Sequence, residues 1–250
     1  MAGLAFCIIG AYTLRTVLVG RTKDQRVIRA GGSVLLGRWF LEAFYWSFRL
    51  PGRMFVALGV SPDALTWTSL VITLGAAFSA AMDHFSTAGV FVLLGSFFDS
   101  FDGLVARARG LSSDCGEMLD AVVDRYADVI PMIGLVIFYR FSVWQMMIPL
   151  FAMIGSLLLS YVRAKSEALD LDLPSGLMRR HERVTYVVVA LVIGPELSRW
   201  LGGPWGTVHP ATLAIVAVVA IVSNLSAFNL LLVARRELVR LGRGPKGSKA

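Results

Sequence analysis

The sequence predicts an all-α integral membrane protein, a polytopic bundle of six transmembrane helices preceded by an interfacial amphipathic helix. The chain has 250 residues, of which 56% are hydrophobic and 16% are charged, and its mean hydropathy is +0.68. Soluble domains contain about 45–50% apolar and about 25% charged residues, so a water-soluble globule is excluded. Apolar runs of the roughly 20 residues needed to cross a bilayer recur six times. The Lys and Arg residues gather in the segments on one side of these runs.

The N-terminal segment, residues 1–35, is an apolar and basic extension whose role the sequence leaves open. Its apolar run, 4–20, is interrupted by Arg15 and lacks the basic start and the small-residue cleavage site of a signal peptide. The run suits either an additional span or an interfacial helix. In residues 38–53, aromatic side chains are interleaved with arginines, a mixture typical of a helix that lies among lipid headgroups.

Turn residues and short polar segments divide the rest of the chain into its spans. Ser61 and Pro62 predict a helix N-cap followed by proline at the first helical position. A glycine- and proline-rich break, 202–204, separates the last two spans. We place the spans at residues 65–82, 87–106, 118–139, 143–162, 184–201 and 211–234. The membrane domain then extends over 36–236, and residues 237–250 form a basic cytoplasmic tail.

The distribution of positive charge orients the bundle. Of the 24 Lys and Arg residues, 21 fall in the terminal segments and in the loops on the same side. Arg140 and Arg199 lie on the other side, and Arg125 lies within a span. Basic segments stay in the cytoplasm, so we expect both termini there. The net charge of +7 then reflects loops that face anionic lipid and phosphate-bearing substrates, and we expect no nucleic-acid partner.

Four acidic residues near the loop between the second and third spans are the main functional signal. Asp99 and Asp102 are three residues apart, and Asp120 and Asp124 are four apart, so each pair shares one face of a helix. The connection, 108–117, is short, so the two helices must be antiparallel neighbours. We therefore expect all four carboxylates near one level, at the cytoplasmic membrane surface. A charge at the centre of a membrane helix costs about 2.5–3.5 kcal/mol, which argues that these acids have a function.

These residue types select a hard divalent cation. Four carboxylates this close cannot all stay ionised without cations, and oxygen ligands without a nearby histidine favour Mg²⁺ or Mn²⁺ over zinc. They could hold two ions about 3.5–4 Å apart, the spacing that clamps a phosphate or diphosphate during an in-line displacement. Gly103 and Gly116 lack Cβ atoms and leave room for a bulky ligand. Arg107 could neutralise a diphosphate or pair with a carboxylate.

Two alternative roles for the acidic residues stay open at the level of residue chemistry. The carboxylates could form structural ion pairs with Arg107, Arg109 and Arg125, although four acids in two spaced pairs exceed what three arginines need. They could also line the path of a carboxylate-based cation or proton transporter. A transporter would be expected to spread its acids across the bilayer midplane, whereas these gather at the ends of two adjacent spans. Asp128, one turn beyond Asp124, suits an ion pair as well as a metal contact.

The spacing of these residues resembles a known signature. The pattern Asp99-x2-Asp102-Gly103-x2-Ala106-Arg107-x8-Gly116-x3-Asp120-x3-Asp124 is similar, at every fixed position and every gap, to the signature of the CDP-alcohol phosphatidyltransferase family. The segment 61–66 is similar to the one that opens the first span of that family. The resemblance extends over about 38–236 and leaves out the first 35 residues.

The resemblance implies an enzyme of phospholipid biosynthesis. Members of the family transfer a substituted phosphate from a CDP-linked donor, here CDP-diacylglycerol, to an alcohol and release CMP. By resemblance, Asp99, Asp102 and Asp120 ligate two Mg²⁺ or Mn²⁺ ions, and Asp124 is a further ligand and the general base. The implied CDP-binding residues are Asp102, Gly103, Ala106, Arg107 and Gly116. A homodimer is also suggested, and we expect the site at the cytoplasmic face of a bacterial inner membrane.

Two further segments indicate the acceptor alcohol. Residues 160–167 and 176–183 resemble family branches with phosphorylated acceptors, especially phosphatidylinositol phosphate synthases and phosphatidylglycerophosphate synthases. A phosphate-binding basin would then comprise Arg163, Lys165, Arg180 and Arg183, although loop charges of the cytoplasmic side account for them too. The leading acceptor is a phosphorylated polyol such as inositol phosphate or glycerol phosphate. Many such members carry an arginine late in the sixth span, and 223–230 has none, so an unphosphorylated acceptor such as serine stays open. Asn224 and Asn229 in this stretch suit hydrogen bonds between helices.

Overall fold

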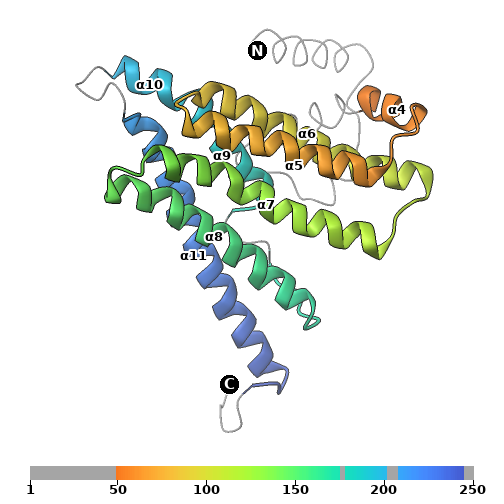
Figure 1. Ribbon diagram of the computed structural model, residues 1–250. Helices are drawn as coiled ribbons and strands as arrows, with labels where there is room; N and C mark the ends of the chain where they lie inside the picture. Colours follow the sequence, from red (N-terminus) through yellow and green to blue (C-terminus); the bar gives the residue numbers. More distant parts are fainter. Residues whose placement is uncertain (1–48, 175–177, 202–207, 245–250) are drawn as a thin grey trace, which may run out of the picture. The chain divides into compact units, whose positions relative to one another are not determined.

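The computed structural model describes residues 49–174, 178–201 and 208–244, and every regular element within them is a helix (Figure 1). The helices are α4 Arg49–Ala57, α5 Pro62–Ala81, α6 Phe85–Arg109, α7 Asp114–Phe138, α8 Val143–Glu167, α9 Arg180–Val192, α10 Gly194–Trp200 and α11 Pro210–Arg240. The all-α prediction is confirmed. The N-terminal extension, 1–35, and most of the predicted interfacial segment lie outside the described residues.

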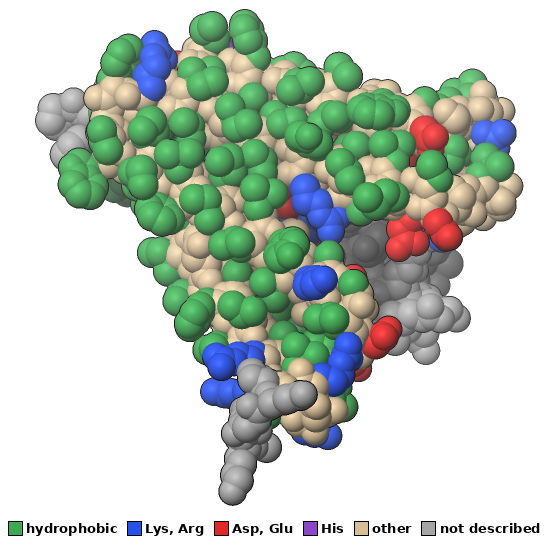
Figure 2. Space-filling model, turned by 60° about the horizontal axis from the view of Figure 1, so that its bottom comes forward, with side chains coloured by type: hydrophobic (Ala, Val, Ile, Leu, Met, Phe, Trp, Pro, Cys, Tyr) green, Lys and Arg blue, Asp and Glu red, His purple; other side chains and the backbone are tan. Residues whose placement is uncertain are grey.

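Four of the described helices are long and apolar enough to cross a membrane: α5, α6, α8 and α11. Hydrophobic side chains cover most of the face drawn in Figure 2, and large ones such as Phe78, Trp144 and Phe228 are exposed, as contact with lipid requires. Helix α7 has 25 residues, the length of a span, but carries five acidic residues and one arginine. Helix α9 has only 13 residues. The count of six spans therefore stays a prediction.

The predicted fifth span, 184–201, differs from the structure because the chain breaks at Ile193. Helix α9 ends at Val192, and α10 begins with Gly194 followed by proline. Proline has no N–H to donate and its ring clashes with the preceding turn, so it is favoured in the first turn of a helix, where Pro195 lies. Gly194 packs so closely on Thr212 that a Cβ would not fit between them. The break thereby sets α10 against α11.

The described helices fall into two compact units. The smaller unit comprises residues 49–64 and 101–112, and the larger unit comprises the remaining described residues. The predicted N-cap lies in the smaller unit and is confirmed: the Ser61 hydroxyl accepts a hydrogen bond from the Ala64 N–H at 3.3 Å, and Pro62 is the first residue of α5.

In the smaller unit, the last turns of α6 hold α4 and the loop that follows it. The ring centroids of Phe55 and Phe101 lie 5.2 Å apart. The Arg109 guanidinium donates to the carbonyl oxygens of Gly59 and Val60, each at 3.0 Å. One buried aromatic contact and one side chain that binds two carbonyls therefore fix the path of the chain into α5.

In the larger unit, small residues let helix backbones approach closely. Helix α8 packs along α11 and beside α7, and both α9 and α10 pack on α11. Gly134 of α7 lies against the backbone of Ala77 on α5, and Gly155 of α8 lies against Asn224 of α11. The Asn224 side-chain amide donates to the carbonyl of Phe151 at 2.9 Å, which confirms the predicted bond between helices. Asn229, for which the same role was predicted, is exposed.

Three connections between helices meet at the end of the larger unit where α6 and α11 begin. The Asp83 carboxylate lies 2.7 Å from Nε2 of His209. The Tyr139 hydroxyl donates to the carbonyl of Val208 at 3.0 Å, and the ring of Phe85 lies 4.8 Å from the His209 ring. These contacts fix the starts of α6 and α11 relative to the end of α7.

Helix α11 is 31 residues long and continues to Arg240, past the start of the predicted tail at residue 237. Beyond it, the Arg243 guanidinium donates to the carbonyl of Leu169 at 2.8 Å, just after the end of α8. The boundary expected at residue 236 therefore falls inside a continuous helix that runs beside α8.

We expect Gly134→Ala to destabilise the bundle, because the new Cβ would lie 2.8 Å from the Cα of Ala77. Overpacking of this kind costs about 1–3 kcal/mol in the free energy of unfolding. Gly75→Ala is the matched control, since its Cβ would lie 3.5 Å from the Phe91 ring, an ordinary contact, and Ala stabilises a helix relative to Gly by up to about 1 kcal/mol. Unfolding of the full chain in detergent micelles measures both, and equal effects would contradict the close approach of α5 and α7.

Candidate active site

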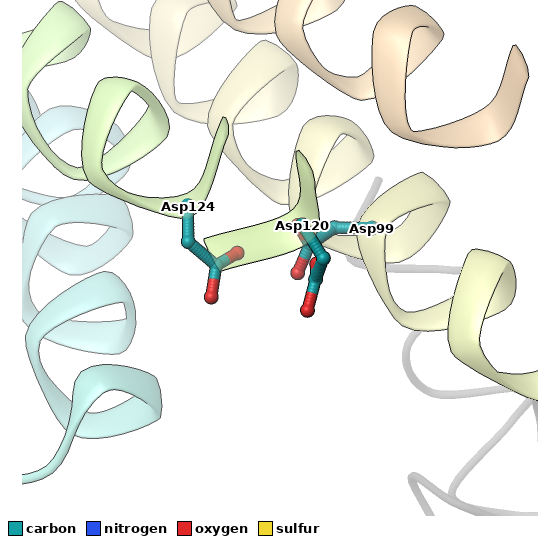
Figure 3. A group of neighbouring side chains, drawn as sticks. All are labelled: Asp99, Asp120 and Asp124. Atoms are coloured by element: carbon teal, nitrogen blue, oxygen red, sulfur yellow. The ribbon is translucent and has the colours of Figure 1, made fainter. Parts of the chain in front are cut away.

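Three of the four predicted carboxylates come together between α6 and α7. Asp99, Asp120 and Asp124, called the acidic cluster below, each place one oxygen within 4.8 Å of the other two, and all three residues are partly buried. Figure 3 shows the carboxylates of α7 and the carboxylate of α6 directed toward a common space. The spacing of four residues in α7 and the short connection from α6 therefore agree with the position of these three acids. Their role as metal ligands stays a prediction.

A defined cap places the acidic residues of α7. The Ser113 hydroxyl accepts a hydrogen bond from the Gly116 N–H at 3.2 Å, with Ser113 in extended conformation. An N-cap of this kind satisfies one of the unpaired N–H groups of the first turn and fixes where the helix starts. Because α7 starts at this point, Asp120 and Asp124 follow in its second and third turns on one face.

The acidic cluster suits a hard divalent cation. The Oδ1 atom of Asp99 is buried and has no hydrogen-bond partner among the described residues. A buried carboxylate oxygen normally has a partner, and here two further carboxylates lie beside it. Oxygen atoms of carboxylates are the ligands that Mg²⁺ and Mn²⁺ prefer. The residues present therefore fit the implied metal.

Arg180, the first residue of α9, connects the carboxylates of two helices. Its Nη1 donates to Oδ2 of Asp99 at 2.9 Å, and its Nη2 lies 2.7 Å from Oδ1 of Asp124. Its Nε lies 3.4 Å from Oδ1 of Asp128. Burial lowers the pKa of this guanidinium, but the three carboxylates raise it by more, so the pKa lies above its ordinary value and Arg180 is charged.

Asp128 and Arg183 form a buried ion pair one turn deeper in the bundle. The distance from Arg183 Nη2 to Asp128 Oδ2 is 2.7 Å. The Arg183 side chain is 5% exposed and the Asp128 side chain is 6% exposed. Arg183 also donates to the Ser160 hydroxyl at 3.3 Å. A cavity of about 20 Å³, lined by both charged residues and by Ser156, adjoins the pair and has room for one water. Of the roles left open for Asp128, the structure shows the ion pair with a neighbouring helix.

The first turn of α9 is held by its own cap. The backbone N–H of Arg179 donates to the Glu182 carboxylate at 2.9 Å, and Glu182 is buried. A glutamate that reaches back to the residue before the helix forms one half of a capping box, and Glu182 supplies that half, while Arg179 stands where Ser or Thr would supply the other. With the first turn fixed, Arg180 and Arg183 project from one face toward α7.

The remaining two residues of the predicted phosphate basin lie on the last turns of α8. The Arg163 guanidinium donates to the carbonyl of Pro174 at 3.2 Å, and Lys165 is exposed. Of the four basic residues, Arg180 is placed directly against the acidic cluster. For Arg163, Lys165 and Arg183, acceptor contact stays a prediction.

Most of the predicted CDP-binding residues lie on the last turns of α6, in the smaller unit. Asp102 follows Asp99 by one turn and is buried. The Arg107 guanidinium folds back along the helix so that a Cβ on Gly103 would lie 3.0 Å from its Nη1. Gly103 therefore makes room for the Arg107 side chain, a reason that the sequence alone did not reveal. The CDP-binding roles of Asp102, Gly103, Ala106, Arg107 and Gly116 all remain predictions.

The sequence profile of CDP-alcohol phosphatidyltransferase matches residues 59–232, which is more than half of the chain. The chain belongs to this family. It is therefore a membrane transferase of phospholipid biosynthesis. The match decides against the transporter that the acidic residues alone left open.

Several members of the family resemble this chain. The phosphatidylinositol phosphate synthase of Mycobacteroides abscessus is 34% identical over 175 residues, which cover 68% of this chain and 77% of the relative. The archaetidylinositol phosphate synthase of Pyrococcus horikoshii is 32% identical over 142 residues, which cover 56% of this chain and 73% of the relative.

Solved structures share the fold of this chain. A crystal structure of Mycobacterium tuberculosis phosphatidylinositol phosphate synthase in complex with manganese and citrate has a TM-score of 0.65 and 24% identity, covering 75% of this chain and 88% of that chain. A structure of the same enzyme with CDP-DAG bound has a TM-score of 0.63 and 24% identity, covering 73% and 90%. At this identity the likeness shows the shared fold.

We expect Arg183→Met alone to destabilise the protein, because the buried Asp128 would lose its partner at 2.7 Å and keep only the longer contact of 3.4 Å with Arg180 among the described residues. Breaking a buried pair in this way costs about 3–5 kcal/mol, whereas replacing both partners by apolar residues is close to neutral. The double variant Asp128→Leu/Arg183→Met is therefore expected to unfold near the wild-type temperature when the full chain is heated in detergent micelles. A double variant as unstable as the single one would show that the pair has another stabilising role.

Proposed function

We propose that this enzyme transfers the phosphatidyl group of CDP-diacylglycerol to a hydroxyl of inositol phosphate and releases CMP. The relatives from Mycobacteroides abscessus and Pyrococcus horikoshii are named as inositol phosphate lipid synthases. The Mycobacterium tuberculosis enzyme of the same fold has been solved with CDP-DAG bound. These names support a CDP-linked lipid donor and a phosphorylated polyol acceptor for this chain.

The position of Arg180 is the observation that carries the choice of acceptor. A guanidinium fork binds phosphate through two parallel hydrogen bonds. Arg180 presents such a fork beside Asp99 and Asp124. A phosphate held by Arg180 would keep the polyol attached to it within reach of the acidic cluster. Serine offers a single carboxylate to the same arginine, and we treat it as an outcome of the acceptor test below.

The residues of α6 and α7 would divide the chemistry between them. Asp99, Asp102, Asp120 and Asp124 would hold Mg²⁺ or Mn²⁺, two ions in our proposal, and the bound ions would supply the positive charge that holds the diphosphate and stabilises the departing CMP. The CDP moiety would lie against Asp102, Gly103, Ala106, Arg107 and Gly116.

Asp124 would act as the general base. It takes the proton of the acceptor hydroxyl as that oxygen bonds to the phosphorus that carries diacylglycerol. The bond from this phosphorus to the CMP oxygen breaks, and CMP leaves with the electron pair. The products are one phospholipid and CMP, and the proton remains on Asp124 until it passes to water.

The proposal places the site at the cytoplasmic face of a bacterial inner membrane, with both chain termini in the cytoplasm. The distribution of Lys and Arg supports this orientation. A site at the interface lets a lipid donor keep its chains in the bilayer while a polar acceptor arrives from water. A homodimer remains part of the proposal, on the resemblance alone.

We expect purified protein in nanodiscs with CDP-diacylglycerol and Mn²⁺ to release CMP with inositol 1-phosphate. Glycerol 3-phosphate, inositol, serine and glycerol, supplied one at a time, are expected to give no new lipid by mass spectrometry. Asp124→Asn should lower the rate by about 10²–10⁴, the usual contribution of a general base. The control Asp114→Asn removes an exposed acid in the first turn of the same helix and should keep the rate. Release of CMP with serine alone would identify serine as the acceptor in place of inositol phosphate. If no acceptor gave CMP, the proposed transfer reaction would be contradicted.

We expect Arg180→Gln to raise KM for inositol 1-phosphate by about ten- to a hundredfold, since charge-assisted hydrogen bonds to the phosphate are lost. KM for CDP-diacylglycerol should stay near the wild-type value. Arg199→Gln serves as the control, because among the described residues Arg199 pairs with the exposed Glu196 in the same short helix. Steady-state kinetics with each substrate varied in turn provide the measurement. An equal rise in both KM values would show that Arg180 does not select the acceptor.

A further inference from the structure

The oxygen atoms that Arg180 contacts belong to two of the three carboxylates of the acidic cluster. Its guanidinium lies 2.9 Å from Asp99 and 2.7 Å from Asp124, and these two residues with Asp120 form the group that could hold an ion. A divalent cation needs carboxylate oxygens at about 2.0–2.6 Å and repels a guanidinium that shares them. Arg180 and a metal ion therefore compete for the negative charge of the same two carboxylates.

We infer that Arg180 is a built-in counter-cation of the metal site, which a divalent ion displaces and which then becomes available to the acceptor phosphate. This inference rests on the proposed function, since it takes the acidic cluster as the metal site. It adds an order of binding: metal and donor bind first, and the acceptor binds afterwards to the arginine that they release. Arg180 in this role sets the metal affinity and acts on the acceptor in a later step.

The surroundings of Arg180 allow it to leave the acidic cluster without leaving the site. Its side chain is 32% exposed, so it is not locked by packing. Its Nε lies 3.4 Å from Asp128, a carboxylate outside the cluster. Asp128 is already neutralised by Arg183 at 2.7 Å, so it attracts Arg180 without holding it as tightly as an unpaired acid would. After displacement, Arg180 keeps one carboxylate neighbour and frees its two terminal nitrogen atoms.

Competition of this kind couples the two ligands in both directions. If the metal releases Arg180 for the phosphate, a phosphate that holds Arg180 must tighten the binding of the metal by the same factor. The coupling passes through one side chain, so removing that side chain should remove it. If the coupling between metal and phosphate came from positive charge alone, it would persist in any variant that keeps a cation at residue 180.

The first test measures the affinity for Mn²⁺, by electron paramagnetic resonance, of the full chain in nanodiscs without nucleotide. Arg180→Gln is expected to bind Mn²⁺ about tenfold more tightly than wild type, because one charge-assisted hydrogen bond and one ion pair no longer oppose the ion. Arg180→Lys should lie between the two, since one ammonium group cannot contact both carboxylates. The control Arg140→Gln removes the same charge from an arginine that binds the Ile137 carbonyl, and its affinity should not change. An unchanged affinity in Arg180→Gln, or a Lys variant equal to wild type, would overturn the inference.

The second test adds inositol 1-phosphate to the same titrations. The compound should tighten Mn²⁺ binding to wild type and to Arg140→Gln but not to Arg180→Gln, in which the coupling side chain is absent. Equal tightening in all three proteins would mean that the phosphate binds the ion itself, and the inference would fail. Thermal unfolding of each variant verifies that it is folded.

The outcomes separate this inference from the proposed function. If wild type binds Mn²⁺ no better than Asp124→Asn, the acidic cluster is not the metal site, and the proposed function fails together with the inference. If wild type binds Mn²⁺ through Asp124 but Arg180→Gln has the same affinity, only the competition is refuted.

Discussion

The balance of charge in a bundle with few charged residues is the constraint on which the rest of the site depends. The acidic cluster and Asp128 place four carboxylates on two adjacent helices, and so many acids cannot stay ionised in a largely apolar environment without cations nearby. Two arginines in the first turn of α9 provide part of this charge in different ways. Arg183 is fixed to one carboxylate, whereas Arg180 is shared among three. The Arg183–Asp128 pair lines the buried cavity beside the site. In the proposal above, Arg180 moves from the acidic cluster when a metal ion binds there.

The arrangement of the acidic cluster could be predicted from the sequence because local rules leave one solution. Helical periodicity puts Asp120 and Asp124 on one face, and a connection of about ten residues forces the helix that carries Asp99 to return beside them. The helix start at Ser61 and Pro62 follows from the preferences of the first turn in the same way. Composition and the length of the apolar runs together decide the all-helical class, since an apolar chain can satisfy its backbone in a membrane only by helices or a closed barrel, and runs of about 20 residues have the length of a helix.

The partners of the charged residues could not be predicted, because they depend on how one helix is rotated against another. Arg183 and Arg163 lie beside apolar runs in similar basic segments, yet one is buried against Asp128 and the other binds a backbone carbonyl. The break at Ile193 was missed because hydropathy reports the length of an apolar run and not whether its proline continues the helix. The rotamer of Arg107, whose Nη1 would lie 3.0 Å from a Cβ on Gly103, also depends on packing and could not be predicted.

Helix α11 is longer than a membrane span needs to be. At 1.5 Å per residue its 31 residues extend about 46 Å, whereas the hydrocarbon core is about 30 Å thick. The helix is therefore about 16 Å longer than the hydrocarbon core is thick. Just beyond its end, Arg243 donates to the carbonyl of Leu169, which follows α8. The last turn of the helix, which ends at Arg240, is thus held in place from the side by α8. A label attached at this turn would therefore move with the helix and not independently of it.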